Sequence, residues 1–167
     1  VAPSLVTLLA LLVAWGELSD TTSIHDGLDR RAGTGLSRIA YPEMKKAGGG
    51  KIINIGSMMS IFGASFTTPY ATSKGGIVQM SRAMACAWAK DNIQVNCVLP
   101  GWIDTDLTRG ARKQVEGLHE RVLARTPAGR WGDPADFAGI AVFLASAASG
   151  FLTGTAIPVD GGYSVQG

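Results

Sequence analysis

Cysteine, histidine and charge are all scarce in this 167-residue chain. Charged residues make up 17% and the formal net charge is +2, which argues against a nucleic-acid partner. The two cysteines lack CxxC or Cys/His spacing, so a disulfide-stapled fold and a zinc site are both excluded. Cys86 and Cys97 lie in apolar surroundings, and we expect buried, reduced thiols in a cytoplasmic protein. His25 and His119 stand alone and are predicted to be surface residues, so no metal is expected.

Long hydrophobic runs are also lacking. The apolar run Leu5–Trp15 is shorter than the roughly 18 residues that a membrane span needs. No lysine or arginine precedes Arg30, whereas a signal peptide carries positive charge ahead of its apolar stretch. We therefore expect neither a membrane partner nor secretion.

Glycine, in contrast, is abundant. The chain contains 22 glycines, which is about 13% of its residues against an average usage of about 7%. They follow no G-X-Y period, so they predict many tight turns, as an α/β fold has.

From about residue 37 the chain alternates between helix-like and strand-like segments. Apolar residues at helical spacing from Leu36 to Ala47 predict a helix, and the triplet Gly48-Gly49-Gly50 ends it. The order of elements predicts parallel crossovers in a layered α/β sheet. The later elements are a strand Lys51–Gly56, a helix Tyr70–Lys90, a strand Ile93–Val98, a helix around Ala111–Ala124, a helix from Pro134 to about Ser146, and a strand Ala156–Val159.

Tyr70 and Lys74 are four residues apart on one predicted helix. That spacing places both side chains on one face, so the lysine ammonium lies near the phenol oxygen and favours its ionised form. The pKa of the tyrosine would then fall from about 10 toward neutrality, which suits a general acid or base. Ser57 follows the strand Lys51–Gly56, at the carboxyl end where open α/β sheets bind ligands. Its hydroxyl could hydrogen-bond a substrate oxygen beside the tyrosine.

Several linked motifs occur in an order that resembles the short-chain dehydrogenase/reductase family. They are Gly56-Ser57, Tyr70-Ala-Thr-Ser-Lys74-Gly-Gly, the strand Ile93–Val98 running into Pro100-Gly101-Trp102-Ile103-Asp104-Thr105, and a closing stretch from Pro127 to Val159-Asp160-Gly161-Gly162. The resemblance covers about residues 40–167 and implies a Rossmann-like, doubly wound parallel sheet with flanking helices.

The same resemblance implies an activity and its residues. Tyr70 would exchange a proton with an alcohol or carbonyl substrate, Lys74 would lower the tyrosine pKa and hold the nicotinamide ribose, and Ser57 would steady the reacting oxygen. NAD or NADP would carry the hydride. The segment expected over the nicotinamide and diphosphate end of the cofactor comprises Pro100, Gly101, Ile103 and Thr105.

Residues 1–36 do not match the family's opening strand, Gly-rich turn and helix. Gly33 and Gly35 superficially resemble that turn, but the first glycine of the motif would fall on Asp29. The family's Asn-Asn-Ala-Gly motif is missing too, because no asparagine precedes Asn54. We interpret residues 37–167 as a truncated catalytic domain that lacks the N-terminal βαβ half and, with it, the adenosine and diphosphate site.

Without that half, the strand Lys51–Gly56 would expose an apolar edge. Either Leu5–Trp15 or another chain would cover it, and we expect a homo-oligomer, a dimer or tetramer. Two alternatives to an NAD(P)-dependent oxidoreductase remain open. One is a catalytically silent remnant that serves as an oligomerisation or binding module. The other is a hydrolase using Ser57, which the lack of a GxSxG motif disfavours.

Overall fold

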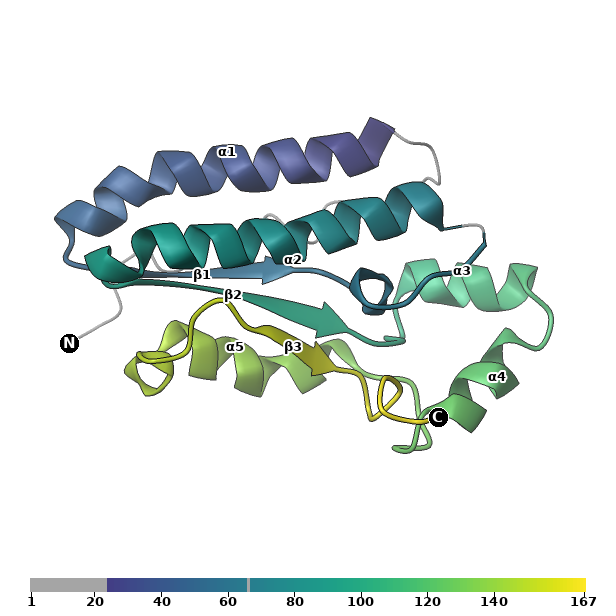
Figure 1. Ribbon diagram of the computed structural model, residues 1–167. Coiled ribbons are helices and arrows are strands. Elements are labelled where there is room, and N and C mark those ends of the chain that lie inside the picture. Colours follow the sequence, from purple (N-terminus) through teal and green to yellow (C-terminus); the bar gives the residue numbers. More distant parts are fainter. Residues whose placement is uncertain (1–23, 66) are drawn as a thin grey trace.

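Three parallel strands form one sheet in the order β1-β2-β3 in the computed structural model (Figure 1). The structure describes residues 24–65 and 67–167, with side chains from residue 35, so the run Leu5–Trp15 lies outside it. Each strand begins and ends close to its predicted position, and the α/β fold is confirmed. The strands are β1 (Gly50–Ile55), β2 (Ile93–Pro100) and β3 (Ala156–Val159).

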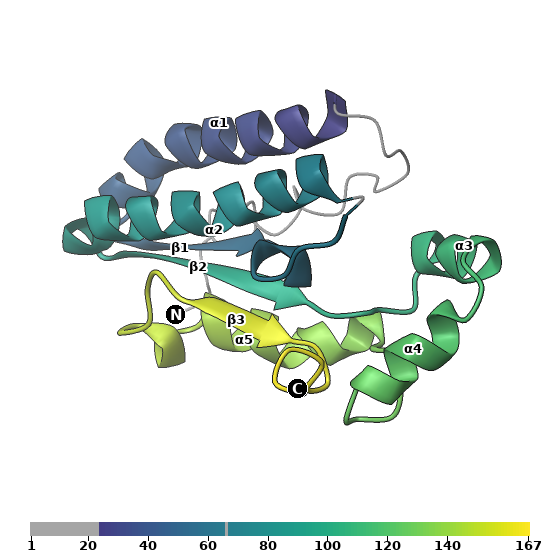
Figure 2. The ribbon, with the colours of Figure 1, turned by 45° about the vertical axis from the view of Figure 1, so that its right-hand side comes forward.

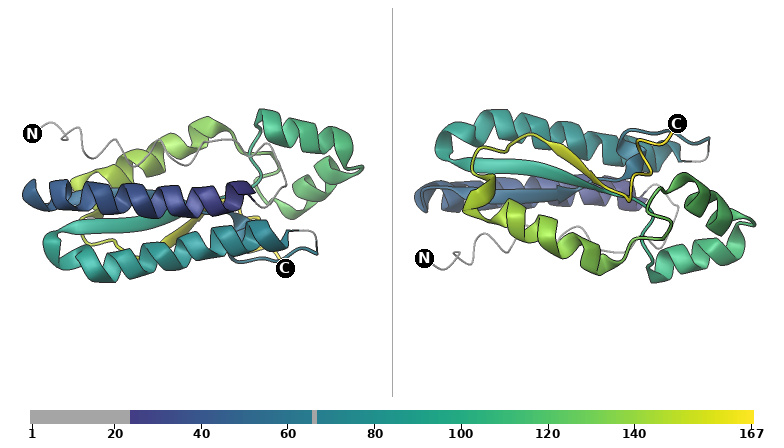
Figure 3. Two further views of the ribbon diagram at one scale, coloured as in Figure 1. Left: turned by 90° about the horizontal axis from the view of Figure 1, so that it is seen from above. Right: turned by 90° about the horizontal axis from the view of Figure 1, so that it is seen from below.

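Helices cover both faces of this sheet. Two long helices, α1 (Ile24–Lys46) and α2 (Thr68–Trp88), lie on one face, and α5 (Ala138–Ala145) lies on the other (Figures 1 and 3). Two further helices, α3 (Asp106–Gln114) and α4 (Leu118–Arg125), project beyond the carboxyl ends of β1 and β2 (Figure 2). Short 3-10 helices are η4 (Met58–Ser60), η5 (Ala89–Asp91), η6 (Pro134–Phe137) and η7 (Ala147–Ser149).

Strand β2 is the centre of the core. Residues 93–99 are all buried, because β2 has a strand on each side and helices on both faces. Successive side chains point to opposite faces. Val95 packs with Ile52 and the α2 residue Met84, whereas Val98 packs with Ile53 and Leu144 of α5.

The two connections between neighbouring strands have opposite hands. The strands follow one another across the sheet, yet α2 joins β1 to β2 on one face and α5 joins β2 to β3 on the other. Since parallel crossovers are almost always right-handed, one of these two departs from the rule.

Helix α1 begins at Ile24, earlier than the sequence predicted, and ends before the glycine triplet as expected. Gly48 and Gly49 have φ values of 83° and 150°, which other residues rarely adopt. The proposed boundary between residues 36 and 37 falls inside this helix. Gly33 and Gly35 also lie within it and form no turn after a strand, in agreement with the sequence analysis.

Two sequence predictions are wrong. The helix expected at Ala111–Ala124 is divided into α3 and α4, because Gly117 adopts a left-handed conformation with φ 68° between them. Cys86 is exposed, since it lies on the outer side of α2, whereas Cys97 in β2 is buried as expected.

Strands β1 and β3 each have one partner among the described residues and so form the two edges of the sheet. Pro158 is exposed on β3 and has no N–H with which to pair another strand. Within residues 24–65 and 67–167, no helix combines the length and the apolar character that crossing a bilayer requires.

Candidate active site

Ser57 lies directly after β1 and starts the short helix η4. Its hydroxyl accepts a 3.2 Å hydrogen bond from the backbone N–H of Met59, and its own N–H donates to Ser60 Oγ at 3.2 Å. Glycine suits the preceding position, because a Cβ on Gly56 would lie 2.5 Å from Leu99 Cδ2 and would require that buried side chain to shift. Close packing on β2 therefore sets where the serine loop leaves the sheet.

Tyr70 and Lys74 lie one turn apart near the start of α2, as the sequence predicted. Lys74 is only 5% exposed, and its Nζ lies 5.7 Å from the centre of the Tyr70 ring. Pro69 in the first turn suits a helix start, because its missing N–H would have no partner inside the helix. Lysine is seldom buried this deeply, so the burial marks the position as unusual.

Ser60 connects the serine loop to α2. Its hydroxyl donates a 2.8 Å hydrogen bond to the backbone carbonyl of Lys74, while it accepts the N–H of Ser57. The sequence analysis missed Ser60. Ser57 and Ser60 form a capping box, but the usual sequence signature of that motif has glutamate or glutamine at the second position, so it does not single out Ser60.

The segment Pro100–Thr105 leaves β2 at the same end of the sheet, because Ile55 and Val98 are paired in the parallel register. Gly101 donates its N–H to Val159 O at 3.0 Å, and a Cβ there would lie 2.6 Å from Asp160 Cα. The chain therefore passes β3 too closely for any side chain at position 101.

Further along this segment, Ile103 forms an isolated parallel bridge with Gly132. Asp104 N donates to Gly132 O at 2.8 Å, which ties the segment to the loop before η6. Thr105 and Thr108 form a capping box at the start of α3. The Thr105 hydroxyl thus holds a helix end in addition to any contact with a ligand.

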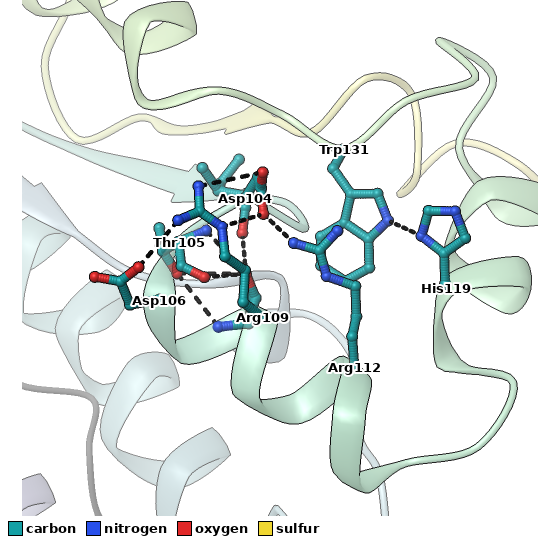
Figure 4. Close-up of polar contacts among 9 residues, drawn as sticks. Asp104, Thr105, Asp106, Arg109, Arg112, His119 and Trp131 are labelled. Carbon is teal, nitrogen blue, oxygen red and sulfur yellow. Dashed lines mark hydrogen bonds and ion pairs between the residues drawn. The ribbon is translucent and has the colours of Figure 1, made fainter.

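Asp104 is the centre of the ion-pair network shown in Figure 4. It pairs with Arg109 at 3.2 Å and with Arg112. The hydrogen bond from Arg109 is the main reason why the pKa of Asp104 lies below its usual range. The Arg112 guanidinium also stacks 4.2 Å from the Trp131 ring. These contacts hold α3 against the segment that leaves β2.

Trp131 Nε1 donates a 3.1 Å hydrogen bond to His119 Nδ1 (Figure 4). His119 is exposed, as predicted, but it is engaged by this tryptophan and not by Ser57. Among the described side chains, Ser57 therefore has no histidine partner of the kind that a serine hydrolase uses.

Two other features bear on the site. A cavity of about 230 Å³ opens next to Pro100–Thr105, but Ser57, Tyr70 and Lys74 are not among its lining residues. The cavity is lined by Trp102, Ile103, Ala128, Arg130, Gly132, Asp136, Val159, Asp160 and Gly161.

Among the residues that the structure describes, no three His, Cys, Asp or Glu side chains gather as a metal site would require.

The described residues fit one end of a dinucleotide. A buried lysine, a tyrosine, a serine and the turn after β2 meet where parallel strands end, which is where such sheets bind nicotinamide cofactors. Before β1, the described part of the chain contains the helix α1 and no glycine-rich turn between a strand and a helix. The predicted site residues therefore lie at the carboxyl end of the sheet, and no such turn precedes them among the described residues.

Comparison with known proteins agrees with this geometry. Residues 30–164 match the family model described as enoyl-(acyl carrier protein) reductase. A 2-dehydro-3-deoxy-D-gluconate 5-dehydrogenase from Escherichia coli is 48% identical over 115 residues, which cover 69% of this chain and 45% of that protein. A tropinone reductase homolog from Arabidopsis thaliana is 41% identical over 132 residues, covering 79% of this chain and 50% of the homolog.

Among solved structures, a gluconate 5-dehydrogenase from Burkholderia cenocepacia in complex with NADP and tartrate superposes with a TM-score of 0.75 at 38% identity. The match covers 79% of this chain and 51% of that one. The chain thus spans about half the length of the curated relatives it matches. Its fold, its linked motifs and these matches together show that the chain belongs to the short-chain dehydrogenase/reductase family.

Proposed function

We propose that this chain acts as an NAD(P)-dependent oxidoreductase that interconverts an alcohol and a carbonyl compound. The observation that carries the proposal is the buried Lys74 beside Tyr70, held to the Ser57 loop through Ser60. A buried ammonium group next to a phenol, at the carboxyl end of a parallel sheet, supports a role in binding or catalysis.

In the reducing direction, Tyr70 donates its hydroxyl proton to the carbonyl oxygen of the substrate. Lys74 stabilises the tyrosinate that remains and binds the ribose next to the nicotinamide. Ser57 hydrogen-bonds the reacting oxygen and orients it toward Tyr70. A nicotinamide bound beside these residues would supply the hydride that the reduction of the carbonyl carbon requires.

The segment after β2 shapes the place where the nicotinamide would lie. Gly101 brings the backbone close to β3, and the capping box of Thr105 fixes the start of α3. A fixed backbone at this point would help to position a bound nicotinamide ring. The residues that we assign to this role are Pro100, Gly101, Ile103 and Thr105.

Cofactor binding and turnover test the proposal separately. We expect NADH or NADPH to bind at millimolar concentration or below, and Tyr70→Phe to abolish hydride transfer without loss of cofactor affinity. Tyr41→Phe is the matched control, because Tyr41 lies on α1, away from the site, and its hydroxyl donates a hydrogen bond to Asp91. If neither cofactor binds, or if Tyr70→Phe retains turnover, the assignment is wrong, and a catalytically silent binding module becomes the better explanation.

The relatives also support a substrate class and an assembly. Two of those described above are named for gluconate or a gluconate derivative, so we propose a polyhydroxy acid or its keto form as substrate. We further propose a homo-oligomer that works in the reducing cytoplasm. Val142 is 70% exposed and Phe143 40% exposed on the apolar helix α5, an arrangement that favours association. A monomeric mass by light scattering at micromolar concentration would contradict this assembly.

A further inference from the structure

The guanidinium of Arg125, the last residue of α4, lies against two aromatic rings. Its Cζ is 4.9 Å from the centre of the Phe62 ring and 4.5 Å from that of Tyr163. The two rings meet edge to face at 6.3 Å. The loop after β1, the end of α4 and the C-terminal turn are far apart in the sequence, and they converge on this one side chain.

Phe62 connects the cluster to the proposed active site. Its N–H donates a 2.9 Å hydrogen bond to Met58 O, so it belongs to the turn that Ser57 starts. It packs beside Met58 and Leu99 in the core cluster under that turn. Arg125 therefore lies at the Ser57 end of the sheet.

Tyr163 is held by a turn that Asp160 organises. One carboxylate oxygen of Asp160 accepts the N–H of Gly162 at 3.0 Å, and the other accepts that of Ser164 at 2.8 Å. Gly162 has φ 88°, and a Cβ on it would lie 3.0 Å from Pro127 Cγ. The turn is thus packed on the residues that directly follow Arg125.

Three arginines of the neighbouring segments have a charge partner that both Arg125 and Arg121 lack among the described residues. Arg109, Arg112 and Arg130 each pair with an aspartate, whereas Arg125 makes no ion pair with any described carboxylate. The contacts with two rings restrict where the guanidinium lies, and they leave its N–H groups able to donate. A planar, oriented donor of this kind matches a carboxylate, which it can bind through two parallel hydrogen bonds.

We propose that Arg125 is a specificity-determining residue that binds the carboxylate of an anionic polyhydroxy substrate beside Ser57 and Tyr70. The inference rests on the proposed function and adds the group that recognises the non-reacting end of the substrate. Phe62 and Tyr163 act as positioning residues, because they orient the guanidinium without touching the substrate's carboxylate.

D-gluconate and D-glucitol provide the test, since they have the same carbon skeleton. D-gluconate carries a carboxylate at the carbon where D-glucitol carries a neutral alcohol. Calorimetry on the full chain is expected to give an affinity for D-gluconate about 10-fold or more above that for D-glucitol, in line with charge-assisted hydrogen bonds. Rising ionic strength should weaken D-gluconate binding and leave D-glucitol binding unchanged.

Arg125→Gln should remove this preference and leave D-glucitol binding as it is, whereas Arg125→Lys should retain part of it. Arg121→Gln is the matched control, because Arg121 lies one turn earlier on α4 and bonds a backbone carbonyl. A structural role for Arg125 would lower the affinity for both ligands alike, so equal losses would overturn the inference.

Three other results would also overturn the inference. The natural chain could show no preference for D-gluconate over D-glucitol, it could bind neither compound at millimolar concentration, or Arg125→Gln could retain the preference. The binding is measured without turnover. If the chain binds D-gluconate more tightly than D-glucitol but transfers no hydride, the proposed oxidoreductase activity is contradicted and the carboxylate site is still supported.

Discussion

The hydroxyl of Ser60 donates a 2.8 Å hydrogen bond to the backbone carbonyl of Lys74, fourteen residues further along the chain. The same oxygen accepts the N–H of Ser57. One small side chain thus holds together two segments that carry proposed catalytic groups. Ser60 need not touch the substrate to affect catalysis, because it sets the position of Ser57 relative to α2.

Ser60→Ala should lower turnover by about 10-fold through misplacement of Ser57, and should destabilise the fold by about 1–2 kcal/mol through the lost hydrogen bonds. A fall in kcat with little change in KM would show that positioning, and not substrate binding, was lost. Ser65→Ala is the control, since Ser65 is an exposed residue of the loop that follows. Unchanged kcat in Ser60→Ala would contradict this role.

The two thiols should differ in reactivity. Burial raises the pKa of Cys97 to about 11, whereas Cys86 is exposed on α2. Because the thiolate is the reactive form, a thiol reagent at pH 8 should modify one cysteine in the native chain and both in denaturant. Cys86→Ser should abolish the native reaction, and a fast native reaction in that variant would refute the buried position of Cys97.

Acid should weaken the contact between α1 and the end of α2. The Tyr41 hydroxyl donates to Asp91 Oδ2 at 2.7 Å, Lys45 pairs with the same carboxylate at 3.1 Å, and both interactions lower the pKa of Asp91 from its ordinary 3.8. A lowered pKa contributes stability that is present above pH 3.8 and is lost as the pH falls through the folded-state value.

Asp91→Asn should therefore be less stable than the natural chain in urea at pH 6, and the two should converge as the pH falls below 3.8. Glu120→Gln, a change at an exposed carboxylate on α4, is the control. A constant gap between Asp91→Asn and the natural chain from pH 6 to pH 2 would refute the ionic explanation.

Two glycine substitutions should have opposite effects on stability. Gly101→Ala should destabilise the fold, because the new Cβ would lie 2.6 Å from Asp160 Cα in the adjoining backbone. Gly110→Ala should stabilise it by up to about 1 kcal/mol, because Gly110 is inside α3 with no atom within 4 Å of the new Cβ. Thermal unfolding of both variants checks the pair, and a stable Gly101→Ala would contradict the close approach.

The strands and the proposed catalytic residues could be predicted from the sequence because each rests on a local pattern. In the run Ile93–Val98, the β-branched residues Ile93, Val95 and Val98 favour a strand, although Gln94 and Asn96 between them are polar. The four-residue spacing of Tyr70 and Lys74 places them on one helix face wherever the helix packs. The break between α3 and α4 was missed because a single residue, Gly117, carries it inside an otherwise helix-favouring stretch.

Contacts between distant segments could not be predicted in this way. The hydrogen bond of Ser60 to Lys74 and the contact of Arg125 with the Tyr163 ring depend on how the elements pack, and no residue spacing encodes them. Burial of Cys86 was inferred from apolar neighbours in the sequence, but those neighbours point to different sides of α2. Sequence patterns describe single elements, whereas much of the candidate site lies between elements.

The opposite hands of the two crossovers bear on the order in which the chain folds. Helix α2 packs on both strands that it joins, so β1, α2 and β2 gain core contacts as soon as residues 56–92 close the loop. Strand β3 reaches β2 only after residues 101–155 have turned back by way of the opposite face. During refolding we expect the amide protons of β2 that pair with β1 to become protected from hydrogen exchange first, and those that pair with β3 to become protected last. The C-terminal turn that carries Tyr163 would then form at the end of folding.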